Sequence, residues 1–273
     1  MVAYDENLLH AVQQCELEIL KEIDLICRKH KIRYFAIGGT ALGAVRHHGF
    51  IPWDDDIDIA MPRKDYERFL SIAPKELPAL YFIQNFHTEK NSPFYFTKIR
   101  KRHTKFVEYY LKNVSIHHGV FVDIFPFDHV PSHPSIKKIH FFICYALYQL
   151  YLAKSLSTAC STRFERKSNW KSRIRRILHL ILLPVPKNIL FHSLDYAVRF
   201  FNKYASEEIA HIVRKRLKVR LDSLYPRFYQ QFEDIKIPLP AKYDEYLSNQ
   251  FGDYMTLPPV EKRYGHLPYY VSL

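Results

Sequence analysis

Residues 38–59 read GGTALGAVRHHGFIPWDDDIDI. The five residues before them, RYFAI, are mostly apolar and favour a β-strand, so Gly38 and Gly39 are predicted to form a turn at its end. A short helix follows up to His47, with Thr40 available as its N-terminal cap. A glycine turn at a helix N-terminus lets the backbone approach a phosphate group, and the helix end favours negative charge.

The aspartates that end this stretch predict a metal site. A second strand is expected over Ile57–Ala60, and alternation along a strand places Asp56 and Asp58 on one face. Two such carboxylates repel each other unless a cation lies between them, and Mg²⁺ binds carboxylates together with substrate phosphates. Asp123 interrupts the apolar strand 120–125, where an acid is costly to bury unless it is paired or metal-bound. We expect these three aspartates to bind Mg²⁺ or Mn²⁺.

The aspartate run also has an ordinary interpretation, because adjacent acids are typical of a solvated acidic turn. The two glycines upstream and Asp123 in a separate apolar strand favour a functional site instead. A calcium loop of the EF-hand type is disfavoured, because no glycine and glutamate follow the acids at the required spacing.

The rest of the chain predicts an α/β (α+β) fold with a helical second part. Helices are expected over 8–31 and 63–73, and strands over 81–86, 94–100 and 120–125, which together form a mixed sheet domain. From residue 136 onward the pattern becomes helical. The predicted parts are a catalytic domain over 1–135, a basic, apolar helical region over 136–237, and a C-terminal segment over 238–273 that packs on the catalytic site.

Charge is distributed unevenly along the 273 residues. The 40 Lys and Arg against 28 Asp and Glu give +12, of which residues 137–187 carry +10 while residues 1–136 are neutral. Such an excess favours an anionic partner, which includes nucleic acid, a phosphorylated substrate or an anionic membrane. Because the basic residues of 137–187 accompany apolar helices, we expect docking on an anionic membrane surface, with a solvated basic face as the alternative. Nucleic acid is the weaker alternative, since no RNA-binding motif is present.

Composition predicts a folded protein of a reducing compartment. Hydrophobic residues make up 48% and charged residues 25%, which excludes a wholly disordered chain. The cysteines lack metal-binding or disulfide-framework spacing, and Met1 to His10 lack the features of a signal peptide. No apolar run reaches 18 residues. We expect cytoplasmic localisation, peripheral on the inner face of the membrane.

Further side chains are candidates for binding a phosphorylated donor. Basic side chains could bind phosphate oxygens, Trp53 could stack on a base, and the tail could close over the donor. The ordinary alternatives are exposed surface charges and aromatics that pack in the core. The candidates are Gly38, Gly39, Thr40, Arg46, His47, Trp53, Lys98, Arg100, Asp253, Tyr254, Glu261, Arg263 and His266.

The stretch 38–59 closely resembles the LicD family, to which fukutin and fukutin-related protein are distant relatives. Residues 118–128, HGVFVDIFPFD, are similar to the family's third-carboxylate motif. Residues 251–263, FGDYMTLPPVEKR, together with His266, resemble its C-terminal motif. The likeness covers most of the chain and is weakest in the basic middle.

This resemblance implies a nucleotidyltransferase-like mixed sheet with a helical insertion and a C-terminal extension. It implies a Mg²⁺-dependent transfer of phosphocholine, or a related phospho-alditol, from a CDP-activated donor to a hydroxyl of a cell-surface glycan, with release of CMP. The glycan would be teichoic acid, lipopolysaccharide or capsule, and it could be lipid-linked. Asp56, Asp58 and Asp123 would hold the metal, and Asp123 could accept the hydroxyl proton. The alternative is a nucleotidyltransferase acting on RNA or a small molecule.

Overall fold

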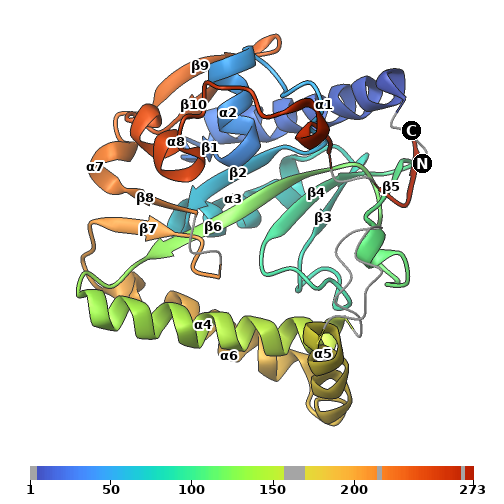
Figure 1. The fold of residues 1–273 in the computed structure, drawn as a ribbon, viewed down its shortest axis with the longest axis vertical. Helices are drawn as coiled ribbons and strands as arrows, with labels where there is room; N and C mark the ends of the chain where they lie inside the picture. Colours follow the sequence, from blue (N-terminus) through green and yellow to red (C-terminus); the bar gives the residue numbers. More distant parts are fainter. Residues whose placement is uncertain (1–4, 157–169, 214–216, 266–267) are drawn as a thin grey trace.

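The computed structural model describes residues 5–156, 170–213, 217–265 and 268–273. A mixed sheet with the order β1-β2-β6-β4-β3 forms its centre, and β7 and β8 extend it beyond the end of β6 (Figure 1). Only β2 and β6 pair in parallel among these strands. The strands are β1 (Phe35–Ala36), β2 (Asp58–Pro62), β3 (Tyr81–Gln84), β4 (Thr97–Lys101), β6 (Phe121–His129), β7 (Glu208–Ala210) and β8 (Lys218–Arg220).

Two helices cover one face of this sheet. α1 (Glu6–Lys29) and α3 (Arg63–Glu76) pack against each other and against β6. The period of its apolar residues makes α1 amphipathic, and Asp5 caps its start by accepting a hydrogen bond from the Asn7 N–H at 3.1 Å. The predicted mixed α/β fold is therefore confirmed for the first part of the chain.

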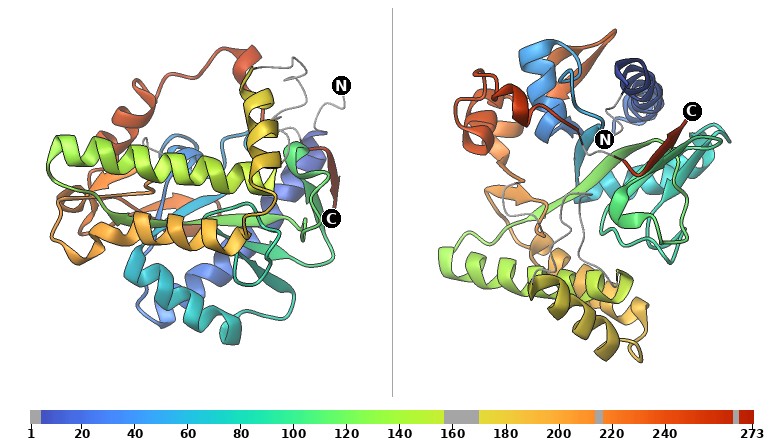
Figure 2. Two further views of the ribbon diagram at one scale, coloured as in Figure 1. Left: turned by 90° about the horizontal axis from the view of Figure 1, so that it is seen from below. Right: turned by 45° about the vertical axis from the view of Figure 1, so that its right-hand side comes forward.

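A separate helical layer lies on the other side of the molecule. α4 (Pro134–Ser155) and α6 (Lys187–Arg199) run side by side, and α5 (Trp170–Ile181) crosses the C-terminal end of α4 (Figures 1 and 2). The layer contributes Cys144, Phe191 and Leu194 to a second buried cluster, which also includes Phe86 and Tyr95 from the first half of the chain. Among the described residues, no helix has the length and apolarity needed to cross a bilayer.

The prediction that residues 136–237 are helical is wrong for their second half. After the short helix η2 (Phe200–Lys203) the chain returns to the sheet, where β7 pairs antiparallel with β6. β9 (Phe228–Phe232) and β10 (Ile235–Leu239) then form a hairpin. These strands have three to five residues each, and β7 and β8 depend on pairing that a local pattern does not reveal.

The C-terminal part returns to the first half of the chain. α8 (Tyr243–Phe251) contacts α2 (Gly38–His47), and the tail ends in β11 (Tyr270–Ser272), which pairs with β5 (Lys105–Val107). The other short elements are η1 (Tyr109–Leu111), α7 (Leu221–Leu224) and η3 (Val260–Lys262). Cys15, Cys27 and Cys144 are buried free thiols, and Cys160 lies outside the described residues.

Candidate active site

The glycine turn is the start of α2 itself. The helix begins at Gly38, whose φ of +57° favours glycine, and Ile37 is the N-cap without a side-chain hydrogen bond. The prediction that Thr40 caps the helix is wrong. Its hydroxyl instead accepts a hydrogen bond from the Asp58 N–H at 2.8 Å. Thr40 therefore ties α2 to the strand that carries the carboxylates.

A tyrosine of α8, in the C-terminal part of the chain, contacts the start of α2. The Gly38 N–H donates to the Tyr246 hydroxyl at 3.2 Å. Burial, together with the charge of Asp58, raises the pKa of Tyr246, so the phenol stays neutral. Sequence reasoning missed Tyr246, because nothing near it in the chain indicates that α8 packs on the start of α2.

Three charged side chains form a row across three neighbouring strands. Asp58 of β2 is the register partner of Asp123 of β6, and Asp123 is the register partner of Lys98 of β4. Lys98 Nζ lies 2.8 Å from Asp123 Oδ1 and 3.3 Å from the ring centroid of Phe121. Burial raises the pKa of Asp123, and the adjacent ammonium of Lys98 opposes that rise. The row thus unites two of the three predicted metal ligands with one predicted donor-binding residue.

Lys98 and Arg100 are buried, not exposed as the ordinary interpretation assumed. The Arg100 guanidinium donates to Gln84 Oε1 and to the Gly119 carbonyl at 2.6 Å. Both basic groups also approach Glu108, at 3.7 Å from Lys98 and 3.5 Å from Arg100. Glu108 was missed from the sequence, although its charge offsets part of the buried positive charge. Arg100 holds strands and loops together rather than facing open space.

The aspartate loop lies beside a buried acid of α1. Gln13 donates to the Asp54 carbonyl at 2.8 Å, which fixes the loop against the helix. Glu16 is fully buried, and neither of its carboxyl oxygens accepts a hydrogen bond. Desolvation, followed by the charges of Asp56 and its two preceding aspartates, raises the pKa of Glu16 well above its ordinary value. Sequence analysis missed Glu16, since it occupies one position in the apolar stripe of an amphipathic helix.

Within the described ranges, no three His, Cys, Asp or Glu side chains converge as a ready metal site. The side chains still suit a hard cation as metal ligands, because Asp58 and Asp123 supply carboxylate oxygens from paired positions on neighbouring strands. Asp123 Oδ1 is buried and accepts no well-aligned hydrogen bond, despite its ion pair with Lys98. Asp56 lies two residues ahead of Asp58 and is partly exposed. The residues present therefore fit Mg²⁺ in their chemistry.

A cationic corner lies next to the aspartate loop. Arg46, at the end of α2, donates to the Tyr254 carbonyl at 2.8 Å, and burial and the charge of Arg263 lower its pKa. The Arg263 guanidinium lies 5.4 Å from the centre of the Trp53 ring, and His47 meets the same ring edge-on at 6.2 Å. Two neighbouring guanidinium groups repel each other, so an anionic ligand would stabilise this corner.

Only part of the C-terminal motif, residues 251–263 with His266, lies near the aspartate loop. The hydroxyl of Tyr254 donates to Asp244 at 2.6 Å, and Asp253 accepts from Thr256 at 2.6 Å. Glu261 is exposed, and His266 lies outside the described residues. Gly265 packs so tightly that an added Cβ would lie 2.6 Å from Asp55 Oδ1, which places this part of the tail directly on the aspartate loop.

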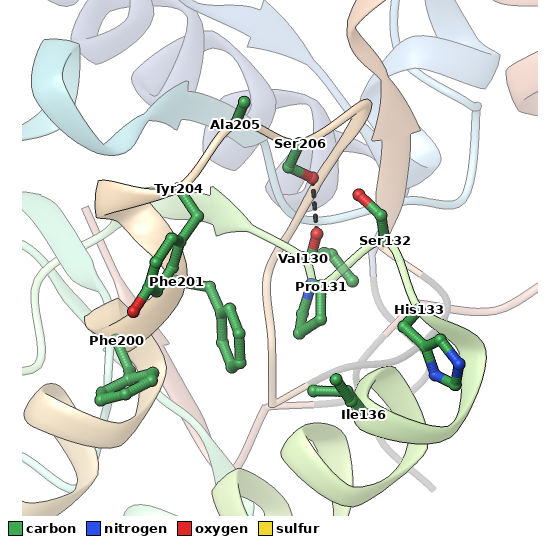
Figure 3. Close-up of a pocket in the computed structure, with 10 residues that line it drawn as sticks. All are labelled: Val130, Pro131, Ser132, His133, Ile136, Phe200, Phe201, Tyr204, Ala205 and Ser206. Atoms are coloured by element: carbon green, nitrogen blue, oxygen red, sulfur yellow. Dashed lines mark hydrogen bonds between the residues drawn. The ribbon is translucent and has the colours of Figure 1, made fainter.

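An apolar pocket elsewhere is too distant to hold a donor for this site. Its lining comes from the end of β6, the start of α4 and η2 (Figure 3). Val130, in its wall, is seven residues beyond Asp123 along an extended strand, a separation of about 23 Å. The pocket therefore belongs to the helical layer and not to the carboxylate row.

Comparison with known proteins places these features in a family. The family model "LicD/FKTN/FKRP, nucleotidyltransferase domain" matches residues 31–144, which include α2, the aspartate loop and β6. The chain thus contains a LicD-type domain over residues 31–144. Over its length it is similar to the lipopolysaccharide cholinephosphotransferase LicD of Haemophilus influenzae, with 28% identity and 92% of each chain covered.

Two shorter similarities involve uncharacterised rickettsial proteins. The protein from Rickettsia typhi is 41% identical over 58 residues, which cover 21% of this chain and 19% of the relative. The protein from Rickettsia prowazekii is 33% identical over 104 residues, covering 31% and 38% respectively.

Proposed function

We propose that this LicD-family transferase moves phosphocholine, or a related phospho-alditol, from a CDP-activated donor to a hydroxyl of a cell-surface glycan. The H. influenzae relative, named a lipopolysaccharide cholinephosphotransferase, supports phosphocholine as the group and lipopolysaccharide as the acceptor class. In the reaction the acceptor oxygen bonds to the phosphorus that carries choline. The diphosphate bond to CMP breaks, and CMP leaves with the bridging oxygen.

The observation that carries the proposal is the charged row beside the N-terminus of α2. Asp58, Asp123 and Lys98 are consecutive register partners across three strands. Gly38, at the start of α2, lies next to this row, because a Cβ built on Gly38 would be 3.4 Å from Asp58 Oδ2. Carboxylates, a cation and a helix N-terminus that lie this close together support the binding of a diphosphate, because such groups can orient it and neutralise its charge.

We further propose that Asp56, Asp58 and Asp123 hold Mg²⁺ when the donor binds. The metal would neutralise charge on the phosphate oxygens. The chain's own groups do the remaining work. Arg46 and Arg263 would bind the diphosphate, and Trp53, which already packs against Arg263, would stack on the cytosine ring. Asp123, held beside Lys98 in the same row, would accept the acceptor's hydroxyl proton.

A donor-binding experiment tests this assignment. Thermal shifts of the purified protein are measured with Mg²⁺ and CDP-choline, CDP-ribitol or CDP-glycerol in turn. We expect one donor to raise the melting temperature only with the metal present, and Asp58→Asn to lose that rise while keeping its fold. Asp234→Asn is the matched control, since Asp234 is exposed and pairs with Lys21 at the surface. Unchanged donor binding in Asp58→Asn would refute the metal assignment.

A further inference from the structure

The helical layer formed by α4, α5 and α6 exposes an unusual amount of apolar surface. Of the 26 large hydrophobic side chains that are exposed among the described residues, 14 lie between residues 136 and 204. Phe142 of α4 is 69% exposed, and Ile177 and Ile181 of α5 are 57% and 63% exposed. A surface of this kind marks an interaction site rather than scattered single residues.

The apolar side chains follow helix faces. On α4, Ile139, Phe142 and Ile143 are spaced by three and four residues, which places them on the side opposite the buried Cys144. On α5, Ile174, Ile177 and Ile181 form the same kind of stripe. α5 packs on the end of α4, where Arg175 donates to Gln149 at 3.1 Å. The two exposed stripes therefore belong to one layer, which Figure 2 shows from below.

Basic side chains border these stripes. Lys138 on α4 and Arg173 and Arg176 on α5 are exposed, and residues 170–187 contain five Lys or Arg and no acid. Lys187 is an exception, because its ammonium binds the carbonyls of Lys90 and Ser92 within the fold. An apolar stripe flanked by arginines is the composition of a helix that lies in the interface of an anionic membrane.

We propose that α4 and α5 dock this protein on an anionic lipid surface, with Ile177 and Ile181 entering the headgroup region and Arg173 and Arg176 binding lipid phosphates. Two other occupants fit less well. Nucleic acid would use the arginines but leave the isoleucines exposed to water. A symmetric dimer through this face would bring the same unneutralised arginines together.

Vesicle flotation tests the proposal without any need for activity. The protein is floated with phosphatidylcholine vesicles and with vesicles in which phosphatidylglycerol replaces part of that lipid. We expect recovery with the anionic vesicles only, weakening at high salt. Arg173→Glu with Arg176→Glu should lower the partition coefficient by more than tenfold, because each basic residue near such a surface is worth about fivefold.

A second pair of variants separates docking from simple charge attraction. Ile177→Ser with Ile181→Ser should also weaken binding, whereas Leu25→Ser on α1, at 61% exposure, and Arg68→Glu on α3 should not. Circular dichroism establishes that every variant is folded. The proposal is overturned by equal recovery with neutral and anionic vesicles, by no recovery with either, by full binding of the isoleucine variant, or by a stable dimer that only this variant disrupts.

Discussion

Lys98 is the residue on which the carboxylate row depends for charge balance. It is 1% exposed and lies 2.8 Å from Asp123, so removing its ammonium leaves a buried carboxylate without its cation. We predict that Lys98→Met lowers the free energy of unfolding by about 3–5 kcal/mol at neutral pH. Denaturant unfolding measures this loss.

The pH dependence of that loss identifies its cause. At acidic pH the carboxyl of Asp123 is protonated in the variant and no longer needs a buried cation beside it. The loss in the free energy of unfolding should therefore be smaller at acidic pH than at neutral pH. Lys21→Met removes an exposed ion pair with Asp234 and should cost less than about 1 kcal/mol. A Lys98→Met protein as stable as the wild type would show that the pair contributes nothing.

Glu16 should make the folded protein less stable as pH rises. Its pKa lies well above 4.5 in the folded state, because burial and the neighbouring aspartates disfavour its charged form. The folded state therefore binds more protons than the unfolded state between the two pKa values, and the free energy of unfolding falls as pH increases through that window. We predict that Glu16→Gln removes this fall.

Unfolding curves from pH 4 to pH 8, recorded without metal, give the comparison. The stability of Glu16→Gln relative to the wild type should increase as the pH rises above the pKa of an unfolded glutamate, until the pH passes the raised pKa of Glu16. Glu18→Gln, on the same helix but 56% exposed, serves as the control. Parallel pH profiles for wild type and Glu16→Gln would contradict the prediction.

The residues that sequence reasoning found and missed differ in kind. Asp58 and Asp123 were found because an acid inside a short apolar strand stands out locally. Glu16, Glu108 and Tyr246 were missed because each gains its significance from a partner far away in the chain. The burial of Lys98 was missed for the same reason, since basic residues are mostly exposed.

At the scale of elements, a hydrogen bond between a backbone amide of α2 and a phenol of α8 links these two helices, which also pack against each other. Tyr246→Phe removes the acceptor of the Gly38 N–H and leaves that buried amide unpaired. We predict a loss of about 1–3 kcal/mol in the free energy of unfolding. Chemical denaturation measures it, with Tyr229→Phe as the control because Tyr229 is 45% exposed. Equal losses in the two variants would argue against the contact.

Elements with a strong local pattern were predictable from the sequence, and short paired ones were not. The apolar period of α1 and the β-favouring run of β6 determine those elements without help from the rest of the chain. β5, β7, β8 and β11 have three residues each and exist through pairing between distant segments. The return of the chain from α6 to the sheet could not be predicted for this reason.

At the scale of the whole molecule, the described residues form two buried clusters, and we therefore expect the helical layer to open separately from the sheet. Phe191 stacks on Phe86 at 3.9 Å between ring centroids and belongs to the smaller cluster. We predict that Phe191→Ala costs about 3–5 kcal/mol within that layer. Hydrogen exchange should then accelerate in α4 and α6 more than in β6.

Phe228→Ala is the control for this prediction, because Phe228 is 41% exposed and lies in the β9–β10 hairpin. Uniform acceleration across α4, α6 and β6 in Phe191→Ala would show that the layer and the sheet open as one unit.

We propose above all that the row of Asp58, Asp123 and Lys98 serves the transfer of a phosphate-containing group. Phosphorus NMR of the wild-type protein with CDP-choline, Mg²⁺ and lipopolysaccharide follows that chemistry directly. We expect the two diphosphate signals to disappear while a CMP signal and a phosphodiester signal grow together, and Asp58→Asn to leave the donor intact. The measurement is repeated with CDP-ribitol and CDP-glycerol. Persistent diphosphate signals in the wild type with each of the three donors, or equal CMP formation by Asp58→Asn, would contradict this role of the row.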